Sequence, residues 1–239
     1  MWNSIKRQFR VQRDDWMLDK FLIAGGTVFG VLLLWLITTL DSSVDTCFQV
    51  GTILSSFIAA VYLFANMASG MKTYFNMEIG MGSTRRRFIV SYFVVTAVNA
   101  LAEVLVIAGL SVAEKWLYGI VYPTLLLEMD FTPYVLRWWM PAALVVIAVG
   151  GLWCALSMRF GRKIFWLGWV LWMFLCIGLP RIHSAYEETP NSLFGKIGSA
   201  MFGAIKAVPG SMWMVIAVGT TVIGVAGTYV LMRGQQVVE

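Results

Sequence analysis

The sequence predicts an all-α, polytopic membrane protein with six transmembrane helices and both termini on the cytoplasmic side. Three observations lead to this fold class. Of the 239 residues, 59% are hydrophobic and 13% are charged, whereas about a quarter of the residues of a soluble domain are charged. Apolar runs of about twenty residues recur along the chain, and that length suffices to cross a bilayer. Lys and Arg gather in alternate connections, as expected for cytoplasmic segments.

The first segment, residues 1–20, predicts an amphipathic helix that lies in the membrane interface. Trp2, Ile5, Phe9 and Trp16 fall near one helical face, and cations surround them. Such a helix buries its apolar face among lipid tails and sets its cations beside anionic headgroups. A basic tail without structure is the alternative, and the amphipathic periodicity argues against it. The segment is too charged for a signal peptide.

Six spans follow within a single transmembrane domain, residues 1–239. They are expected at residues 21–40, 47–68, 88–110, 138–158, 164–179 and 212–232. Gly26 and Gly30 are four residues apart on the first span, a spacing that lets another helix approach closely. Asp41 and Asp45 mark a short turn. The second span is therefore expected to return antiparallel beside the first.

Two larger connections are expected on the outer side. Residues 112–137 are rich in Trp and Tyr, which settle at headgroup level and predict an interfacial belt. Residues 180–210 carry Phe194, Ile197 and Met201 at helical spacing, which predicts short outer-leaflet helices rather than an exposed loop. Thirteen of the 18 Lys and Arg residues fall in inner segments and five in outer ones, so both termini are predicted to lie inside.

Two intramembrane polar residues, Asn99 and Glu103, lie four residues apart and thus on one face of the third span. An acid within a span is costly and is therefore a candidate functional residue. At 1.5 Å per residue, Glu103 lies roughly 22 Å from the inner end of its helix. Water or a neighbouring helix could satisfy it at that depth, so a packing role stays open beside a functional one.

The cytoplasmic loop between the second and third spans, residues 69–87, is the best candidate for contact with a soluble partner. Met71, Phe75 and Ile79 are four residues apart and form an apolar ridge on one helical face. An apolar ridge in an aqueous loop needs a cover. The sequence therefore predicts that this ridge docks on another protein.

Three cations follow the ridge after a Gly80-Met81-Gly82 break, which is expected to end the helix. They are Arg85, Arg86 and Arg87. Two interpretations of them stay open. They face acidic groups on a partner, or they only anchor the third span at the inner headgroups.

The sequence contains no nucleotide-binding or catalytic motif. Gly195-Lys196 lacks the upstream Gly of a phosphate-binding loop. The single histidine, His183, makes a His-based zinc site inside the membrane improbable, and no Gly-x-Ser-x-Gly elbow occurs. The cations are scattered over several loops, which argues against nucleic acid as a partner. The chain is therefore not expected to be an enzyme or to bind a metal.

The inner loop reads Phe75-Asn76-x-x-Ile79-Gly80-x-Gly82-x-x-Arg85-Arg86-x-Phe88. It resembles the apolar-x-x-x-Gly-x-Ser-Arg-Lys-x-Phe-Phe signature of many small bacterial permeases, with an extra Gly-Met-Gly and a Ser-Thr before the arginines. The amphipathic first helix and the helical connection between spans five and six agree with that layout. The chain thus resembles the membrane subunit of an ABC exporter of the six-helix, type-two permease class.

That resemblance implies a coupling helix at Met71, Phe75 and Ile79, which docks on separate ABC ATPase subunits that bind ATP and Mg. It also implies a second permease subunit, the same or a related chain, across a transport path in the bacterial cell membrane. This chain would itself bind no cofactor. The alternative is a non-transporting membrane immunity or sensory-scaffold protein. A secondary transporter is disfavoured, because the sequence has no inverted repeat of broken spans.

Overall fold

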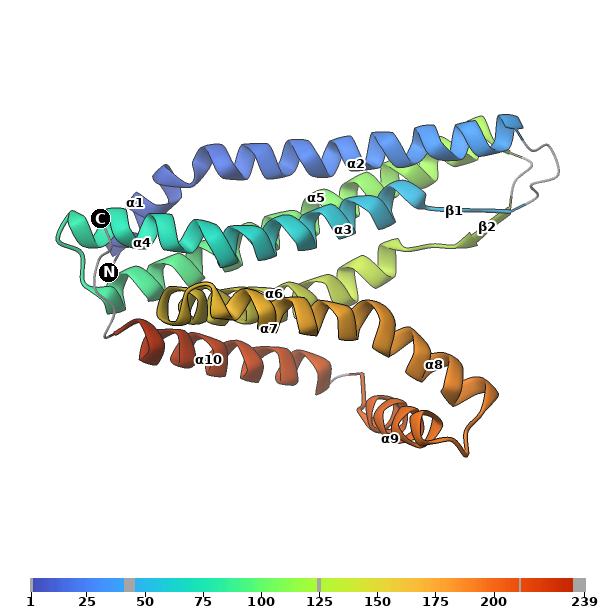
Figure 1. Cartoon of the computed structure of the whole chain (residues 1–239). Helices are drawn as coiled ribbons and strands as arrows, with labels where there is room; N and C mark the ends of the chain where they lie inside the picture. The colour runs from blue at the N-terminus through green and yellow to red at the C-terminus, as the bar shows by residue number, and fades with distance from the viewer. Residues whose placement is uncertain (1, 41–45, 124–125, 211, 234–239) are drawn as a thin grey trace.

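The computed structural model describes residues 2–40, 46–123, 126–210 and 212–233. Long helices lie side by side in one elongated bundle (Figure 1). In chain order the elements are α1 (Trp2–Val11), α2 (Arg13–Leu40), β1 (Thr46–Phe48), α3 (Val50–Ala65), the π-helical turn η1 (Asn66–Gly70), α4 (Met71–Gly80), α5 (Arg85–Val121), β2 (Leu126–Met129), α6 (Thr132–Phe160), α7 (Lys163–Met173), the π-helical turn η2 (Phe174–Gly178), α8 (Leu179–Glu188), α9 (Leu193–Ala207) and α10 (Met212–Met232).

Within those ranges, six helices are long and apolar enough to cross a membrane. They are Arg13–Leu40, Val50–Gly80, Arg85–Val121, Thr132–Phe160, Trp166–Glu188 and Met212–Met232. The chain is therefore a multi-pass membrane protein, and the predicted number of spans is confirmed. The end of the bundle with α1, α4 and the last turn of α10 is here called the α4 end, and the opposite end, with the strands, the β1 end (Figure 1).

The expected interfacial helix is shorter than residues 1–20. It ends at Val11, and Arg13 already begins the first spanning helix. Asp15 and Asp19, which lie beyond this helix, find partners inside the bundle. Residues 13–20 therefore extend the first span toward the α4 end.

The region 69–87 is not a separate loop, contrary to the sequence prediction. One continuous helical segment runs from α3 through η1 into α4 and covers Val50–Gly80. Only residues 81–84 are non-helical before α5 begins. As predicted, the glycines end the helix, and Gly82 has a φ of +80°, which favours glycine.

The β1 end differs from a purely helical fold. Strand β1 pairs in parallel with β2, so that Cys47 lies opposite Leu127. The segment 112–137 is largely helical, since α5 continues to Val121 and α6 begins at Thr132. The predicted turn at Asp41 and Asp45 lies outside the described residues.

Two other sequence predictions have different outcomes. In the connection at 180–210 only α9 is a separate helix, because α8 continues the fifth span to Glu188; the Ser192 hydroxyl caps α9 by accepting a hydrogen bond from Gly195 N at 3.0 Å. Gly30 approaches α3 so closely that a Cβ on it would lie 2.4 Å from Gly51 Cα. The close helix approach expected at Gly26 and Gly30 thus occurs within this chain.

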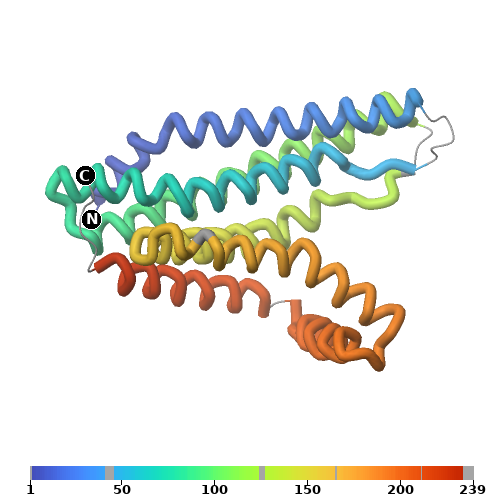
Figure 2. The backbone as a smooth tube through the Cα atoms, viewed as in Figure 1, coloured from blue at the N-terminus to red at the C-terminus, as the bar shows by residue number. Residues whose placement is uncertain are grey.

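The core lies among α2, α3, α5 and α6, and α10 packs mainly against α6 (Figure 2). The span formed by α7 and α8 stands apart. In its most apolar stretch only 6% of the residues are buried, compared with 44% for α5 and for α6. One part of the bundle is therefore closely packed, and another presents most of its surface outward.

Candidate functional site

The predicted apolar ridge is buried in the chain's own core, so its expected role as a free docking surface is wrong. Met71 and Phe75 are each 0% exposed, and Ile79 is half-buried. The Phe75 ring packs edge-to-face on Phe88 of α5, with ring centroids 5.5 Å apart. No soluble partner can reach Met71 or Phe75 while α4 packs this way.

The ridge is buried because it continues the buried face of the second span. Leu63, Met67, Met71 and Phe75 follow one another at four-residue spacing, and all are 0% exposed. In an ideal α-helix such a stripe drifts by about 40° per step. The π turn η1 rotates less per residue and keeps the stripe aligned. The stripe, read from Leu63 onward, is a sequence signal that would have placed the ridge inside.

The π turn is held by a neighbouring helix. The Tyr92 hydroxyl of α5 lies 3.1 Å from the Asn66 carbonyl oxygen and 3.0 Å from Asn66 Oδ1. The Asn66 carbonyl oxygen also accepts the backbone N–H of Met71, which is the i to i+5 bond of a π turn. Tyr92 therefore stabilises the junction between α3 and α4.

The exposed surface at the α4 end lies on the other side of α4 and on the turn that follows. Met77 is 40% and Met81 54% exposed, and Lys72 and Arg87 are also exposed. We call these four residues the exposed tip. Exposed methionines and cations at one end of the bundle suit contact with a protein surface that carries acidic groups.

The three arginines predicted as one group have different surroundings. Arg85 is half-buried, and its guanidinium donates a hydrogen bond to the carbonyl oxygen of Arg233, which links α5 to the end of α10. Arg86 lies beside a groove between α5 and α10. Arg87 belongs to the exposed tip, and its backbone N–H is capped by Thr84 Oγ1 at 3.4 Å.

Helix α1 is attached to the segment that carries the exposed tip. The Arg7 guanidinium forms an ion pair with the Glu78 carboxylate, and the Glu78 side chain is only 1% exposed. A buried carboxylate is costly without such a partner. The pair therefore couples the position of the first helix to that of α4.

The predicted polar pair Asn99 and Glu103 belongs to a buried cluster with two residues of α2. The Asn99 amide donates to Glu103 Oε1 at 2.8 Å and lies 3.4 Å from Asp19 Oδ2. Lys20 Nζ donates to Asn99 Oδ1 at 2.7 Å and to Asp19 Oδ2 at 2.5 Å. Asp19 and Glu103 are both 0% exposed. Glu103 is thus held at Oε1 by Asn99 of its own helix and lies in a cluster with α2, so both the packing and the functional interpretation stay open.

The charges of this cluster do not balance. Two carboxylates face a single ammonium group, with Lys20 Nζ 4.0 Å from Glu103 Oε1. No donor among the described residues reaches Asp19 Oδ1 or Glu103 Oε2. An unbalanced buried charge is costly, so such an arrangement is suited to hold a proton.

The sequence reasoning missed Asp19. The helical period could have revealed it, because Asp19 lies at helical spacing from Ile23 and Gly26 and shares the buried face of α2 with them. A second acid on that face, Asp15, accepts a hydrogen bond from the Tyr74 hydroxyl, and its backbone carbonyl accepts one from Tyr62 at 2.8 Å. The buried polar residues of α2 thus link it to both α3 and α4.

A second polar centre fixes the β1 end. The Glu114 carboxylate accepts hydrogen bonds from Gly51 N and Thr52 N, both at 2.8 Å, and from the Tyr118 hydroxyl at 2.6 Å. A carboxylate at a helix N-terminus satisfies free backbone N–H groups and matches the helix dipole. Burial, together with the Glu114 charge, raises the pKa of the Cys47 thiol. This centre is suited to a structural role.

Neither centre has the form of a metal site. Within the described ranges, no group of three or more His, Cys, Asp or Glu side chains is placed to hold a metal ion. No match to the chain was found among family models, curated proteins or solved structures. Its function therefore has to be argued from its own residues.

Proposed function

We propose that the chain is the permease subunit of an ATP-driven ABC exporter in the bacterial cell membrane. It supplies half of the transport path, and separate ATPase subunits bind ATP and Mg. One observation carries the proposal. A six-span bundle presents an exposed tip of methionines and cations, Lys72, Met77, Met81 and Arg87, at the end where most of its arginines and lysines gather.

The proposed ATPase contact is the exposed tip and no longer the apolar ridge. Methionine side chains adapt to a partner's shape, and cations on the rim favour an acidic surface. Met71 and Phe75 pack between α4 and the core, so they transmit a displacement of the tip without touching the partner. By the positive-inside rule this end is cytoplasmic.

A second permease subunit is expected beside α7. Its apolar face, including Trp166, Trp169 and Trp172, is exposed, and large aromatic side chains are common anchors at interfaces. Lipid can cover the same face. The contact with a second subunit therefore follows from the proposed half-transporter, and the exposed face is not used as evidence for that proposal.

The proposal is tested by co-purification from the native membrane. The double variant Met77→Asp with Met81→Asp is expected to lose the ATPase subunit, because two carboxylates would enter an apolar contact beside acidic groups. Met129→Asp is the matched control, since Met129 is 43% exposed at the β1 end. That variant is expected to retain the partner and its ATP hydrolysis.

Two results would contradict the proposal. One is an ATPase retained at wild-type stoichiometry by the double variant, which would exclude the exposed tip as the contact. The other is a native complex without any ATPase, which would favour the immunity or sensory-scaffold alternative. Elution of each detergent-solubilised variant at the wild-type volume shows that the bundle is intact.

A further inference from the structure

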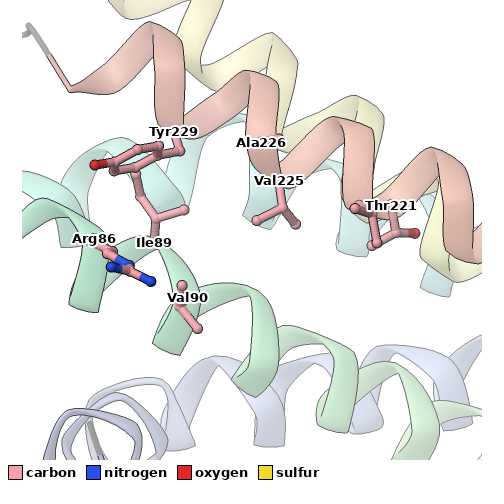
Figure 3. Close-up of a pocket in the computed structure, with 8 residues that line it drawn as sticks. Arg86, Ile89, Val90, Thr221, Val225, Ala226 and Tyr229 are labelled. Atoms are coloured by element: carbon pink, nitrogen blue, oxygen red, sulfur yellow. The ribbon is translucent and has the colours of Figure 1, made fainter.

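A groove with a volume of about 520 Å³ lies between the first turns of α5 and the second half of α10 (Figure 3). Its lining residues are Arg86, Ile89, Val90, Thr221, Val222, Val225, Ala226 and Tyr229. Such a volume falls in the range of small-molecule sites, roughly 300–1,000 Å³. The groove lies where α10, which packs mainly on α6, contacts α5 over only part of its length.

The wall of the groove is apolar along most of its length. Ile89 is 1% exposed, whereas Val222 is 63% exposed and Ala226 is also exposed. The Thr221 hydroxyl is already used, since it donates to the carbonyl oxygens of Leu144 and Ala217. The occupant of this part of the groove therefore needs an apolar segment.

Polar groups gather at one end of the groove. Arg86 and Tyr229 lie together there, and Thr221 lies at the other end (Figure 3). Within the described part of the chain, the Arg86 guanidinium has no ion pair or hydrogen bond, although Arg85 beside it is bonded to Arg233. A guanidinium matches the geometry of a phosphate, and a Tyr hydroxyl can donate to the same group.

The depth of the groove matches one leaflet. Thr221 is eleven residues from Met232, the last residue of α10, or about 16 Å along the helix. Half of a hydrocarbon core about 30 Å thick is 15 Å. A chain lying in the groove would thus run from headgroup level to about the bilayer midplane.

We propose that this groove binds one anionic phospholipid, with its phosphate on Arg86 and one acyl chain between α5 and α10. The chemistry of the groove selects this occupant, because an apolar slot one leaflet deep ends at a guanidinium that has no partner among the described residues. The proposal is independent of the transport function. It concerns a specific lipid site on this chain, whichever proteins bind it.

The test is native mass spectrometry of the purified chain titrated with phosphatidylglycerol or with phosphatidylcholine of the same acyl chains. The wild-type chain is expected to bind one phosphatidylglycerol about five- to tenfold more tightly than phosphatidylcholine, the scale of one cation facing an anionic headgroup. Arg86→Gln is expected to abolish that preference. Arg162→Gln, an exposed arginine in the turn between α6 and α7, is expected to keep it.

A second variant tests the acyl chain separately. Ala226→Trp fills the groove from an exposed position and is expected to reduce binding of both lipids about equally, while Arg86→Gln is expected to reduce binding of phosphatidylglycerol more than that of the zwitterionic phosphatidylcholine. Equal binding of both lipids by the wild-type chain overturns the proposal. An unchanged preference in Arg86→Gln also overturns it. So does a result in which Ala226→Trp dissociates a dimer of the chain without changing lipid binding, because a second copy would then occupy the groove. Elution at the wild-type volume controls for folding.

Discussion

Two regions of this bundle are held together in different ways. The packed region, formed by α2, α3, α5 and α6, combines close backbone contact at Gly30 with buried polar links such as Glu114 to Gly51 and Thr52. The outward region, formed by α7 to α10, contacts the rest mainly through α10 on α6. In α7 every tryptophan is exposed.

The difference shows where specificity is built into the fold. Apolar helices gain little from leaving lipid for one another, so close packing and polar contacts decide which helices associate. The packed region has both, and its geometry is fixed within one chain. Among the described residues of the outward region, both are confined to α10, where Gly224 lies close to Ala148 and the Thr221 hydroxyl donates to the Leu144 carbonyl oxygen. The positions of α7 to α9 are therefore more open to lipid or to a second subunit.

The largest expected effect is a core truncation compared between the two regions. Phe75→Ala removes a fully buried ring and is expected to lower the free energy of unfolding by about 3–5 kcal/mol. Phe174→Ala removes a 49% exposed ring from the outward region and is expected to cost less than about 1 kcal/mol. Thermal unfolding in detergent measures both. Equal losses would mean that the two regions are equally packed.

A glycine pair gives the next effect. Gly30→Ala would place a Cβ against the backbone of Gly51 and is expected to destabilise the chain by about 1–3 kcal/mol. Gly219→Ala on α10 meets no atom within 4 Å and is expected to stabilise it by about 0.5–1 kcal/mol through helix propensity. The same unfolding measurement applies. A neutral Gly30→Ala would contradict the close approach of α2 and α3.

The smallest expected effect is a pH dependence at the β1 end. The Lys115 ammonium, 2.6 Å from Asp130 Oδ2, lowers the pKa of that carboxyl. The pair therefore stabilises the fold above the ordinary carboxyl pKa of about 3.9, and this stabilisation is lost as the pH falls through the lowered value. The difference in melting temperature between wild type and Asp130→Asn is expected to shrink on acidification. A difference in melting temperature that does not change with pH would show that the Lys115–Asp130 ion pair does not stabilise the connection between α5 and α6.

The sequence was sufficient for the number of spans, for a helix in the stretch that became α9, and for the close approach at Gly30. Hydropathy and residue size can be read from the local sequence of a single chain. The sequence does not show which surface covers an apolar face. The ridge at Met71 and Phe75 was therefore assigned to another protein, although it packs on α5. The strand pair β1–β2 was missed because three or four residues are too few to display a period of two.

The cluster around Glu103 was predicted in part for a related reason. Asn99 and Glu103 share one helix, so their spacing placed them on one face. Asp19 and Lys20 come from a helix about eighty residues earlier in the chain, and no local pattern connects the two segments. Tertiary packing decided which residues completed the cluster.

The continuous helical segment Val50–Gly80 is held in place at both of its ends. Its 31 residues extend about 46 Å, well beyond a hydrocarbon core of about 30 Å. The Glu114 carboxylate binds the backbone at the segment's first turn, and Arg7 forms an ion pair with Glu78 in its last turn. A tilt of this helical segment at one end must displace its other end by a comparable distance. The two membrane faces are therefore mechanically coupled through a single helical segment.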